Sequence, residues 1–239
     1  MPEPLQMQRR DKIAPAPGYA PPPASKSVVR EYAEAFGVAI ILALIIRTFF
    51  IQAYKIPSGS MEPTLLIGDH ILVNKLIFGL RIPDSIFGVT PLSGIIPYGH
   101  YVFRLEPVHR GDVVVFVFPP DPTKDFIKRV IGVGGDTVEV RDKSVYLNGR
   151  KMEDPNAHYE PSEKETRIAP RDRYGPVVVP AGKVFVMGDN RDRSYDSRFW
   201  GFVDDNNVEG RAMIIYWSWD SDANSYIPIR WDRFGRIIH

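Results

Sequence analysis

One long apolar run near the N-terminus divides this chain of 239 residues into parts with different constraints. The run extends from Ala35 to Ile46 without a charged residue and continues past Arg47 to Ala53. Its uncharged part is shorter than the roughly 18 residues typical of a membrane span, which leaves a buried core helix as an alternative. Counted through Arg47, whose side chain can reach an interface, the run approaches the roughly 20 residues that cross a bilayer. We therefore predict a transmembrane anchor over residues 31–53.

The residues around this run predict its orientation. Residues 1–30 are rich in Pro and Ala with scattered charge, which predicts a disordered tail. The run starts late and lacks an obvious small-residue cleavage site, so an uncleaved, single-pass anchor is favoured over a secretory signal peptide. The basic residues of the tail predict a cytoplasmic N-terminus, although Arg47 and Lys55 weaken the asymmetry. Everything after Ala53 is then expected on the opposite side of the membrane.

Beyond the anchor, residues 54–239 contain short apolar runs bounded by turn residues, which is the pattern of β-strands. Asn148-Gly149 lies between two such runs and favours a hairpin with a type I′ turn. No helical period of comparable length follows residue 55. The sequence therefore predicts a mainly β fold, with an antiparallel β-sheet body behind an N-terminal transmembrane helix. The expected strands contain residues 71–73, 113–118, 126–131, 138–140, 177–179, 184–187 and 212–217.

Two stretches of this β-rich domain lack a strand pattern and are predicted as loop insertions. Residues 76–98 are apolar but interrupted by Pro and Gly, so we expect a loop that either packs on the body or touches lipid. Residues 156–174 are charged and punctuated by Pro, and we expect a solvated insertion without a specific function.

Composition excludes several kinds of chemistry. A formal net charge of +1 disfavours nucleic acid as a partner, because its binders usually carry a strong basic excess. The absence of cysteine removes disulfides, thiolate zinc sites and cysteine nucleophiles. The five histidines lie apart without a His-Glu-x-x-His pattern. We expect neither a metal nor a cofactor.

The first candidate for chemistry is Ser60, in the segment Pro57-Ser-Gly-Ser-Met-Glu-Pro-Thr-Leu65. At no more than about 3.6 Å per residue, the chain holds Ser60 within roughly 30 Å of the predicted bilayer surface. Such a cluster of Pro, Ser and Gly is most often a turn. A serine hydroxyl becomes a good nucleophile only beside a base, so catalysis would need a partner from elsewhere in the chain.

Lys128 is the candidate for that partner. In a strand it shares one face with Phe126 and Val130, and apolar neighbours lower the pKa of an amine by removing its hydration. The neutral amine could then act as a base near neutral pH. A lysine at a strand edge with its ammonium group in water is the alternative, and this segment alone favours it. Ser60 and Lys128 together would nevertheless be chemically sufficient.

The segment from Gly188 to Gly201 is dense in charge. Three Asp and three Arg lie between Asp189 and Arg198, which predicts an internally paired loop rather than a calcium site. A solvated surface loop is the ordinary expectation for such a run. A lysine base also needs a second polar group to hold its amine, and Ser194 can both donate and accept a hydrogen bond.

The order and wording of these segments together resemble bacterial signal peptidase I, over roughly Ala35 to Trp217. The resemblance implies a membrane-bound serine endopeptidase that removes signal peptides from secretory preproteins. It also implies the bacterial inner membrane, with a cytoplasmic N-terminus, a periplasmic catalytic domain and membrane lipid as a partner. The matching blocks are the anchor, Pro57 to Asp69, Arg110 to Phe116, Phe126 to Gly132, and Gly188 to Gly201.

The resemblance also assigns roles to residues. Ser60 is expected to attack the scissile carbonyl, with Lys128 as the general base. Ser58 and the backbone N–H of Ser60 are expected to form the oxyanion hole. The family accepts small residues one and three positions before the cut, and the expected pocket walls are Tyr54, Ile56, Met61, Leu65, Ile71, Val115 and Ile127.

In the charged segment, Ser194 resembles the hydroxyl that orients the lysine, while Asp196 and Arg198 resemble supporting residues. Arg193 stands where the family usually carries Asn, which puts the pairing within this segment in doubt. Two rival interpretations remain open at this point. A self-cleaving Ser–Lys repressor should carry a DNA-binding domain in place of the anchor, and a membrane-tethered binding module would use the same parts without chemistry.

Overall fold

The protein is described by a computed structural model that covers residues 27–81, 101–160, 169–220 and 228–239. Nearly all of the predicted tail lies outside these described residues. The same holds for residues 82–98 of the first predicted insertion and 161–168 of the second. The chain divides into two units, residues 1–41 and 42–239.

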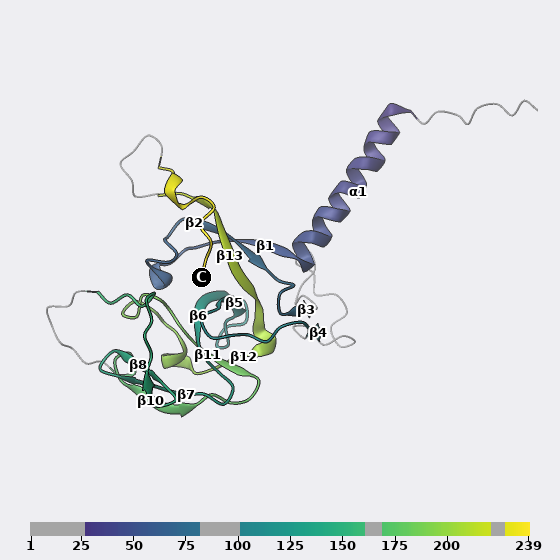
Figure 1. The fold of residues 1–239 in the computed structure, drawn as a ribbon. Coiled ribbons are helices and arrows are strands. Elements are labelled where there is room, and N and C mark those ends of the chain that lie inside the picture. The colour runs from purple at the N-terminus through teal and green to yellow at the C-terminus, as the bar shows by residue number, and fades with distance from the viewer. Residues whose placement is uncertain (1–26, 82–100, 161–168, 221–227) are drawn as a thin grey trace, which may run out of the picture. The chain divides into compact units, whose positions relative to one another are not determined.

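Helix α1 (Val28–Phe49) contains the apolar run (Figure 1). Its side chains are mostly Ala, Leu, Ile and Val, and Glu31 in the first turn and Arg47 in the last match the helix dipole. Within the described residues, α1 is the single helix long and apolar enough to cross a membrane by length and composition. The predicted limits shift at both ends. The helix starts inside the predicted tail, and residues 51–53 of the predicted anchor belong to a strand because they pair with residues 72–74.

The body is mainly antiparallel β, as predicted (Figure 1). Its main sheet has seven strands in the order β1-β2-β13-β5-β6-β11-β12, and each neighbouring pair is antiparallel. The β-branched residues of β5 are buried on both faces of the sheet, which places this strand in the core. The bounds are β1 (Ile51–Lys55), β2 (Asp69–Asn74), β5 (Val113–Val117), β6 (Asp125–Val133), β11 (Lys183–Met187), β12 (Val203–Asp204) and β13 (Val208–Ser218).

Two smaller sheets complete the body. Four strands form the order β10-β7-β8-β9, and β3 pairs with β4. The predicted hairpin turn is confirmed, since Asn148 and Gly149 join β8 to β9 with φ of 52° and 78°, the positive values that a type I′ turn requires. The bounds are β3 (Gly79–Arg81), β4 (Tyr101–Arg104), β7 (Thr137–Arg141), β8 (Ser144–Leu147), β9 (Arg150–Lys151) and β10 (Tyr174–Val178). Short helices lie at η1 (Gly59–Met61), α2 (Ser197–Trp200), η2 (Asp205–Asn207) and η3 (Trp231–Arg233).

Both predicted insertions need correction where they are described. The first contains strand β3 near its start and is therefore not all loop. Phe78, just before this strand, is fully buried in a core cluster with Val114 and Phe116. Burial of this aromatic ring anchors the start of the segment on the body. The second insertion is not simply solvated, because Asp172 is 1% exposed and the segment ends in strand β10.

Candidate active site

Ser60 lies in the short helix η1, which is separated from strand β1 by residues 56–58. Ser60 is buried, whereas Ser58 is exposed in an extended conformation (φ −137°, ψ 152°) and makes no capping hydrogen bond through its side chain. The carbonyl of Ser60 accepts a hydrogen bond from the backbone N–H of Asn190, at 3.2 Å. A backbone bond from a distant segment therefore holds this serine in place.

Lys128 meets Ser60 from strand β6. Its Nζ donates hydrogen bonds to Ser60 Oγ at 2.8 Å and to the carbonyl of Ile127 at 2.8 Å. The ring centroid of Phe126, two residues earlier on the same face, lies 5.3 Å from Nζ. Lys128 is 4% exposed, so the alternative of a strand-edge lysine with its ammonium group in water is wrong.

Burial lowers the pKa of Lys128 to about 8, and the charges of Asp196 and Asp189 oppose this shift. The desolvation effect wins because neither carboxylate forms an ion pair with the amine within the described residues. An amine with this pKa is partly neutral near pH 7, so it can accept a proton there.

The segment Gly188–Gly201 packs against Ser60 through its first glycine. A Cβ at Gly188 would lie 2.3 Å from the carbonyl oxygen of Ser60 and 2.4 Å from Ser194 Oγ, so only glycine permits this approach. The N–H of Gly188 donates to Ser194 Oγ and to Asp196 Oδ2, both at 3.1 Å. The predicted helper Ser194 is therefore buried beside the backbone of Ser60, where its hydroxyl oxygen accepts from Gly188.

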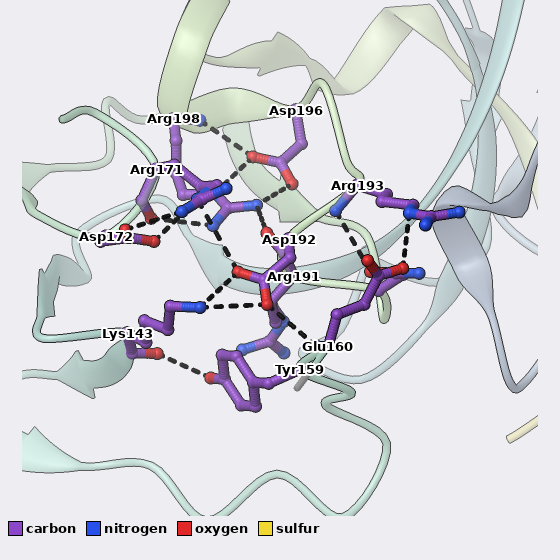
Figure 2. Close-up of polar contacts among 11 residues, drawn as sticks. Lys143, Tyr159, Glu160, Arg171, Asp172, Arg191, Asp192, Arg193, Asp196 and Arg198 are labelled. Carbon is purple, nitrogen blue, oxygen red and sulfur yellow. Dashed lines mark hydrogen bonds and ion pairs between the residues drawn. The ribbon is translucent and has the colours of Figure 1, made fainter. Parts of the chain in front are cut away.

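The charges of this segment are paired, but mostly not with one another (Figure 2). Only Asp196 and Arg198 pair within it, at 2.8 Å. The others pair with residues outside it: Asp189 with Arg129, Arg191 with Asp154, Asp192 with Lys143, and Arg193 with Glu160. Two expectations from the sequence are therefore corrected, since the segment is neither a solvated surface loop nor paired mainly within itself. Most of the segment is buried, so its charged side chains meet opposite charges on neighbouring strands and loops.

The seven residues expected to form substrate pockets lie in one apolar cluster. Five of them are buried, while Tyr54 and Ile127 are partly exposed and pack against the others. They come from β1 and the residue after it, η1 and the segment that follows it, β2, β5 and β6. Met61 follows Ser60 and Ile127 precedes Lys128, so the cluster directly adjoins the serine and the lysine.

Comparison with known proteins identifies the family of this chain. The family model described as "Signal peptidase, peptidase S26" matches residues 29–217. The chain belongs to this family. Signal peptidase I of Pseudomonas aeruginosa is 34% identical over 87% of this chain and 79% of its own length. Signal peptidase I of Aquifex aeolicus is 36% identical over 75% of this chain and 80% of its own length.

A crystal structure of a signal peptidase I from Enterococcus faecalis covers 45% of this chain and 97% of its own, with 33% identity and a TM-score of 0.36. Membership of the S26 family makes the chain a serine endopeptidase. Removal of signal peptides from preproteins is the activity that this family supports. The apolar helix α1 fits a membrane-anchored enzyme of this kind.

Sequence reasoning missed the pairing of two residues that hold the candidate site together. Arg129 is 2% exposed and donates to both oxygens of Asp189, at 2.8 and 2.7 Å. Asp189 also accepts from Thr64 Oγ1 at 2.6 Å, which ties the segment that follows Ser60 to β6. The signal was present as an Arg next to Lys128 and an Asp at the start of the charged segment, but pairing across 60 residues is not visible in a pattern.

Proposed function

We propose that this enzyme removes signal peptides by a Ser60–Lys128 dyad. The observation that carries the proposal is the buried hydrogen bond of 2.8 Å between Lys128 Nζ and Ser60 Oγ. A hydroxyl needs an adjacent base to become a strong nucleophile, and an amine with its pKa lowered to about 8 is a suitable base near neutral pH. The sequence similarity to signal peptidases I supplies the substrate class.

In the proposed reaction, neutral Lys128 accepts the proton of Ser60 Oγ as that oxygen bonds to the scissile carbonyl carbon. The tetrahedral intermediate then collapses, the C–N bond breaks, and Lys128 donates its proton to the leaving amine of the mature protein. Water attacks the resulting ester with Lys128 again as the base, which releases the signal peptide and restores Ser60.

Ser58 and the N–H of Ser60 are the proposed donors to the oxyanion. The hydroxyl of Ser58 is not engaged in capping η1 and is exposed, so it can turn toward an incoming carbonyl oxygen. Donors aimed at developing charge often make the largest single contribution to catalysis. Replacement of Ser58 by Ala should therefore lower kcat by about 10²- to 10³-fold.

Ser194, Asp196 and Arg198 are proposed to support the dyad. Ser194 and Asp196 both accept from the N–H of Gly188, which packs against Ser60, and Arg198 holds Asp196. In this proposal Ser194 also turns its hydroxyl toward Lys128 during the reaction. Arg193 is largely exposed and pairs with Glu160, so its departure from the usual Asn should leave catalysis intact.

The apolar cluster beside the dyad is the proposed source of cleavage specificity. Side chains that are already packed together leave only shallow space, which favours small residues one and three positions before the cut. An extended substrate would add main-chain hydrogen bonds to strand edges, while alternate side chains enter the pockets.

We further propose a single-pass protein of the bacterial inner membrane with its N-terminus in the cytoplasm and its catalytic domain in the periplasm. The length of α1 supports a single span. The basic residues before the apolar run support a cytoplasmic N-terminus. Membrane lipid is then a partner and nucleic acid is not, in keeping with the net charge of +1.

The proposal is tested by cleavage of a preprotein bearing an Ala-x-Ala site, with the full chain in detergent. Wild type should cut after the second Ala, and Ser60→Ala and Lys128→Met should each lose at least about 10³-fold in kcat/KM. Arg193→Asn is the matched control, because it changes a charged side chain of the same site region that is 67% exposed. Full activity of either dyad variant would overturn the assignment, and a folded wild type that never cuts would favour a membrane-tethered binding module.

A further inference from the structure

A charge pair beside the apolar cluster has no part in the proposed catalytic steps. Arg81 in β3 and Glu209 in β13 form an ion pair of 3.1 Å, and their side chains are 4% and 11% exposed. Arg81 also donates through Nε to the carbonyl of Asn206, at 3.0 Å. A buried ion pair is weak evidence for stability, because removing two charges from water offsets most of their attraction. A role in fixing geometry explains such a pair better.

The second carboxylate oxygen of Glu209 accepts a hydrogen bond from a predicted pocket residue. Tyr54 donates its hydroxyl proton to Glu209 Oε2 at 2.6 Å, while Glu209 Oε1 faces Arg81. Burial and the charge of Glu209 raise the pKa of Tyr54 above its ordinary value, so the hydroxyl remains a donor. The ring of Tyr54 packs against the apolar cluster, and its position is therefore fixed at both ends.

The backbone of β13 is shaped to deliver Glu209. Val208 pairs with Phe116 and Gly210 with Val115, which leaves Glu209 as the extra residue of a β-bulge. Bulges redirect a side chain and are common beside active sites. Gly210 is required there, since a Cβ would lie 2.5 Å from the carbonyl oxygen of Asn74.

The location of Tyr54 selects one position of the substrate. In the register of the sheet, Lys128 pairs with Val114 and Val114 pairs with Arg211, so Glu209, which holds Tyr54, lies two residues along β13 from the level of Lys128. Residues of an extended peptide advance about 3.3 Å each and alternate faces, so the side chain two residues upstream of the cut-site residue lies about 7 Å farther from the dyad. The offset of Glu209 along β13 matches this spacing, which favours the residue three positions before the cut as the neighbour of Tyr54.

We infer that Glu209 and Arg81 are positioning residues that set specificity, by holding Tyr54 as a rigid wall that limits the side chain three positions before the cut. This inference rests on the proposed function. A tyrosine ring released from Glu209 can rotate about its side-chain bonds and open space for a larger substrate residue. The charge pair then acts through Tyr54 on selectivity, and the chemical step at Ser60 is unchanged.

The test compares kcat/KM for preproteins that carry Ala or Leu three positions before the cut, with Ala directly before it. Tyr54→Phe should raise the Leu-to-Ala ratio by about tenfold, the scale of a few methylene groups in an apolar pocket. A second pair of substrates, with Ala or Val directly before the cut, should keep its ratio within about twofold. A merely structural weakening would lower kcat/KM for all four substrates alike.

Tyr101→Phe is the matched control. Tyr101 also donates its hydroxyl to β13, to the carbonyl of Val208 at 2.7 Å, but it does not contact Glu209 through that bond. The Leu-to-Ala ratio of the Tyr101→Phe variant should stay at the wild-type value. Glu209→Gln keeps a hydrogen-bond acceptor but loses the charge, so it should raise the Leu-to-Ala ratio by a smaller factor than Tyr54→Phe does. This variant replaces Tyr54→Phe in the test if Tyr54→Phe fails to fold.

The outcomes separate this inference from the proposed function. A wild type that cuts Ala and Leu substrates equally well would overturn the proposed cleavage specificity and this inference with it. A wild type that discriminates, with folded Tyr54→Phe and Glu209→Gln variants of unchanged ratio, would overturn this inference alone. An equal rise in Tyr101→Phe would also overturn it, because loosening of β13 in general would then be the cause.

Discussion

Lys128 and Arg129 are consecutive residues of strand β6, and their side chains leave the strand on opposite faces. Both are buried, with exposures of 4% and 2%. Lys128 meets Ser60 and an aromatic ring, whereas Arg129 meets the carboxylate of Asp189 and the carbonyls of Gly111 and His239. Among the described residues, no carboxylate lies within hydrogen-bond distance of the Lys128 amine, whereas Asp189 does so for Arg129.

The contrast shows how one strand can supply both chemistry and support. A buried cation with a carboxylate partner keeps its charge and ties two segments together, as Arg129 does for β6 and the charged segment. A buried cation without one has its pKa lowered, as in Lys128, and can then accept a proton near neutral pH. The presence or absence of a partner, rather than burial itself, decides between the two roles.

The largest effect is expected on the supporting face. Arg129→Met should lower the free energy of unfolding by about 3–5 kcal/mol, because Asp189 would remain buried without its cation. Urea unfolding of the full chain in detergent measures this. The double variant Arg129→Met, Asp189→Asn should recover much of the loss; equal losses in the single and double variants would contradict the role of the unpaired charge.

The opposite sign is expected on the face of β6 that carries Lys128. Lys128→Met should raise the free energy of unfolding at pH 7 by about 1–3 kcal/mol, because it removes a buried ammonium group that has no carboxylate partner. The pKa of Lys128 is about 8 in the folded protein and 10.5 ordinarily, so between these values the unfolded chain binds a proton that the folded protein has released. Wild-type stability therefore rises with pH across this window, and the advantage of the variant should disappear by about pH 10.5.

The same pH series keeps that prediction testable. A loss of stability in Lys128→Met at pH 7 comparable with that in Arg129→Met would erase the difference between the two faces. So would a variant whose advantage over wild type does not change between pH 8 and 10.5.

A smaller effect concerns activity. The neutral fraction of Lys128 increases about tenfold per pH unit below its pKa of about 8, so kcat/KM should rise with that slope and level off above it. Cleavage of a peptide substrate from pH 5.5 to 9.5 measures the profile. Asp196→Asn removes the charge that most strongly raises the pKa of Lys128, so the midpoint should move to lower pH. A midpoint that stays in place would separate this ionisation from Lys128.

The smallest effect is expected where the charged segment reaches solvent. The side chains of Arg193 and Glu160 are 67% and 35% exposed, and exposed pairs contribute about 0–1 kcal/mol. Arg193→Asn should therefore change the free energy of unfolding by less than about 1 kcal/mol. A loss as large as that of Arg129→Met would mean that the whole segment, and not only its buried pairs, acts as a support.

Local patterns determined much of the secondary structure. The Asn148-Gly149 hairpin, the buried strand around Val115 and the single apolar helix all follow from residues that are neighbours in the chain. The predicted ends were less accurate. The anchor gives way to a strand at Ile51 because that residue pairs with Asn74, a contact between residues 23 positions apart.

The charged segment marks the limit of such reasoning. Its balanced charges predict pairing within the segment, yet Asp189 and Asp192 find partners in Arg129 and Lys143. Composition counts charges but does not place them in space. The predicted solvation of residues 156–174 failed in the same way, since Asp172 is 1% exposed and Arg171 pairs with Asp192, whose side chain is 9% exposed.

The sequence alone determined the fold class, the long apolar helix, the family and the two residues proposed for catalysis, because these depend on residue type and local order. Tertiary structure decided that Ser60 and Lys128 are 2.8 Å apart and that the amine is buried without a carboxylate partner in the described chain. It also joined Tyr54 to Glu209 across 155 residues. A pKa and a pocket wall depend on the groups that packing brings within a few ångströms, and no local pattern of residues specifies that distance.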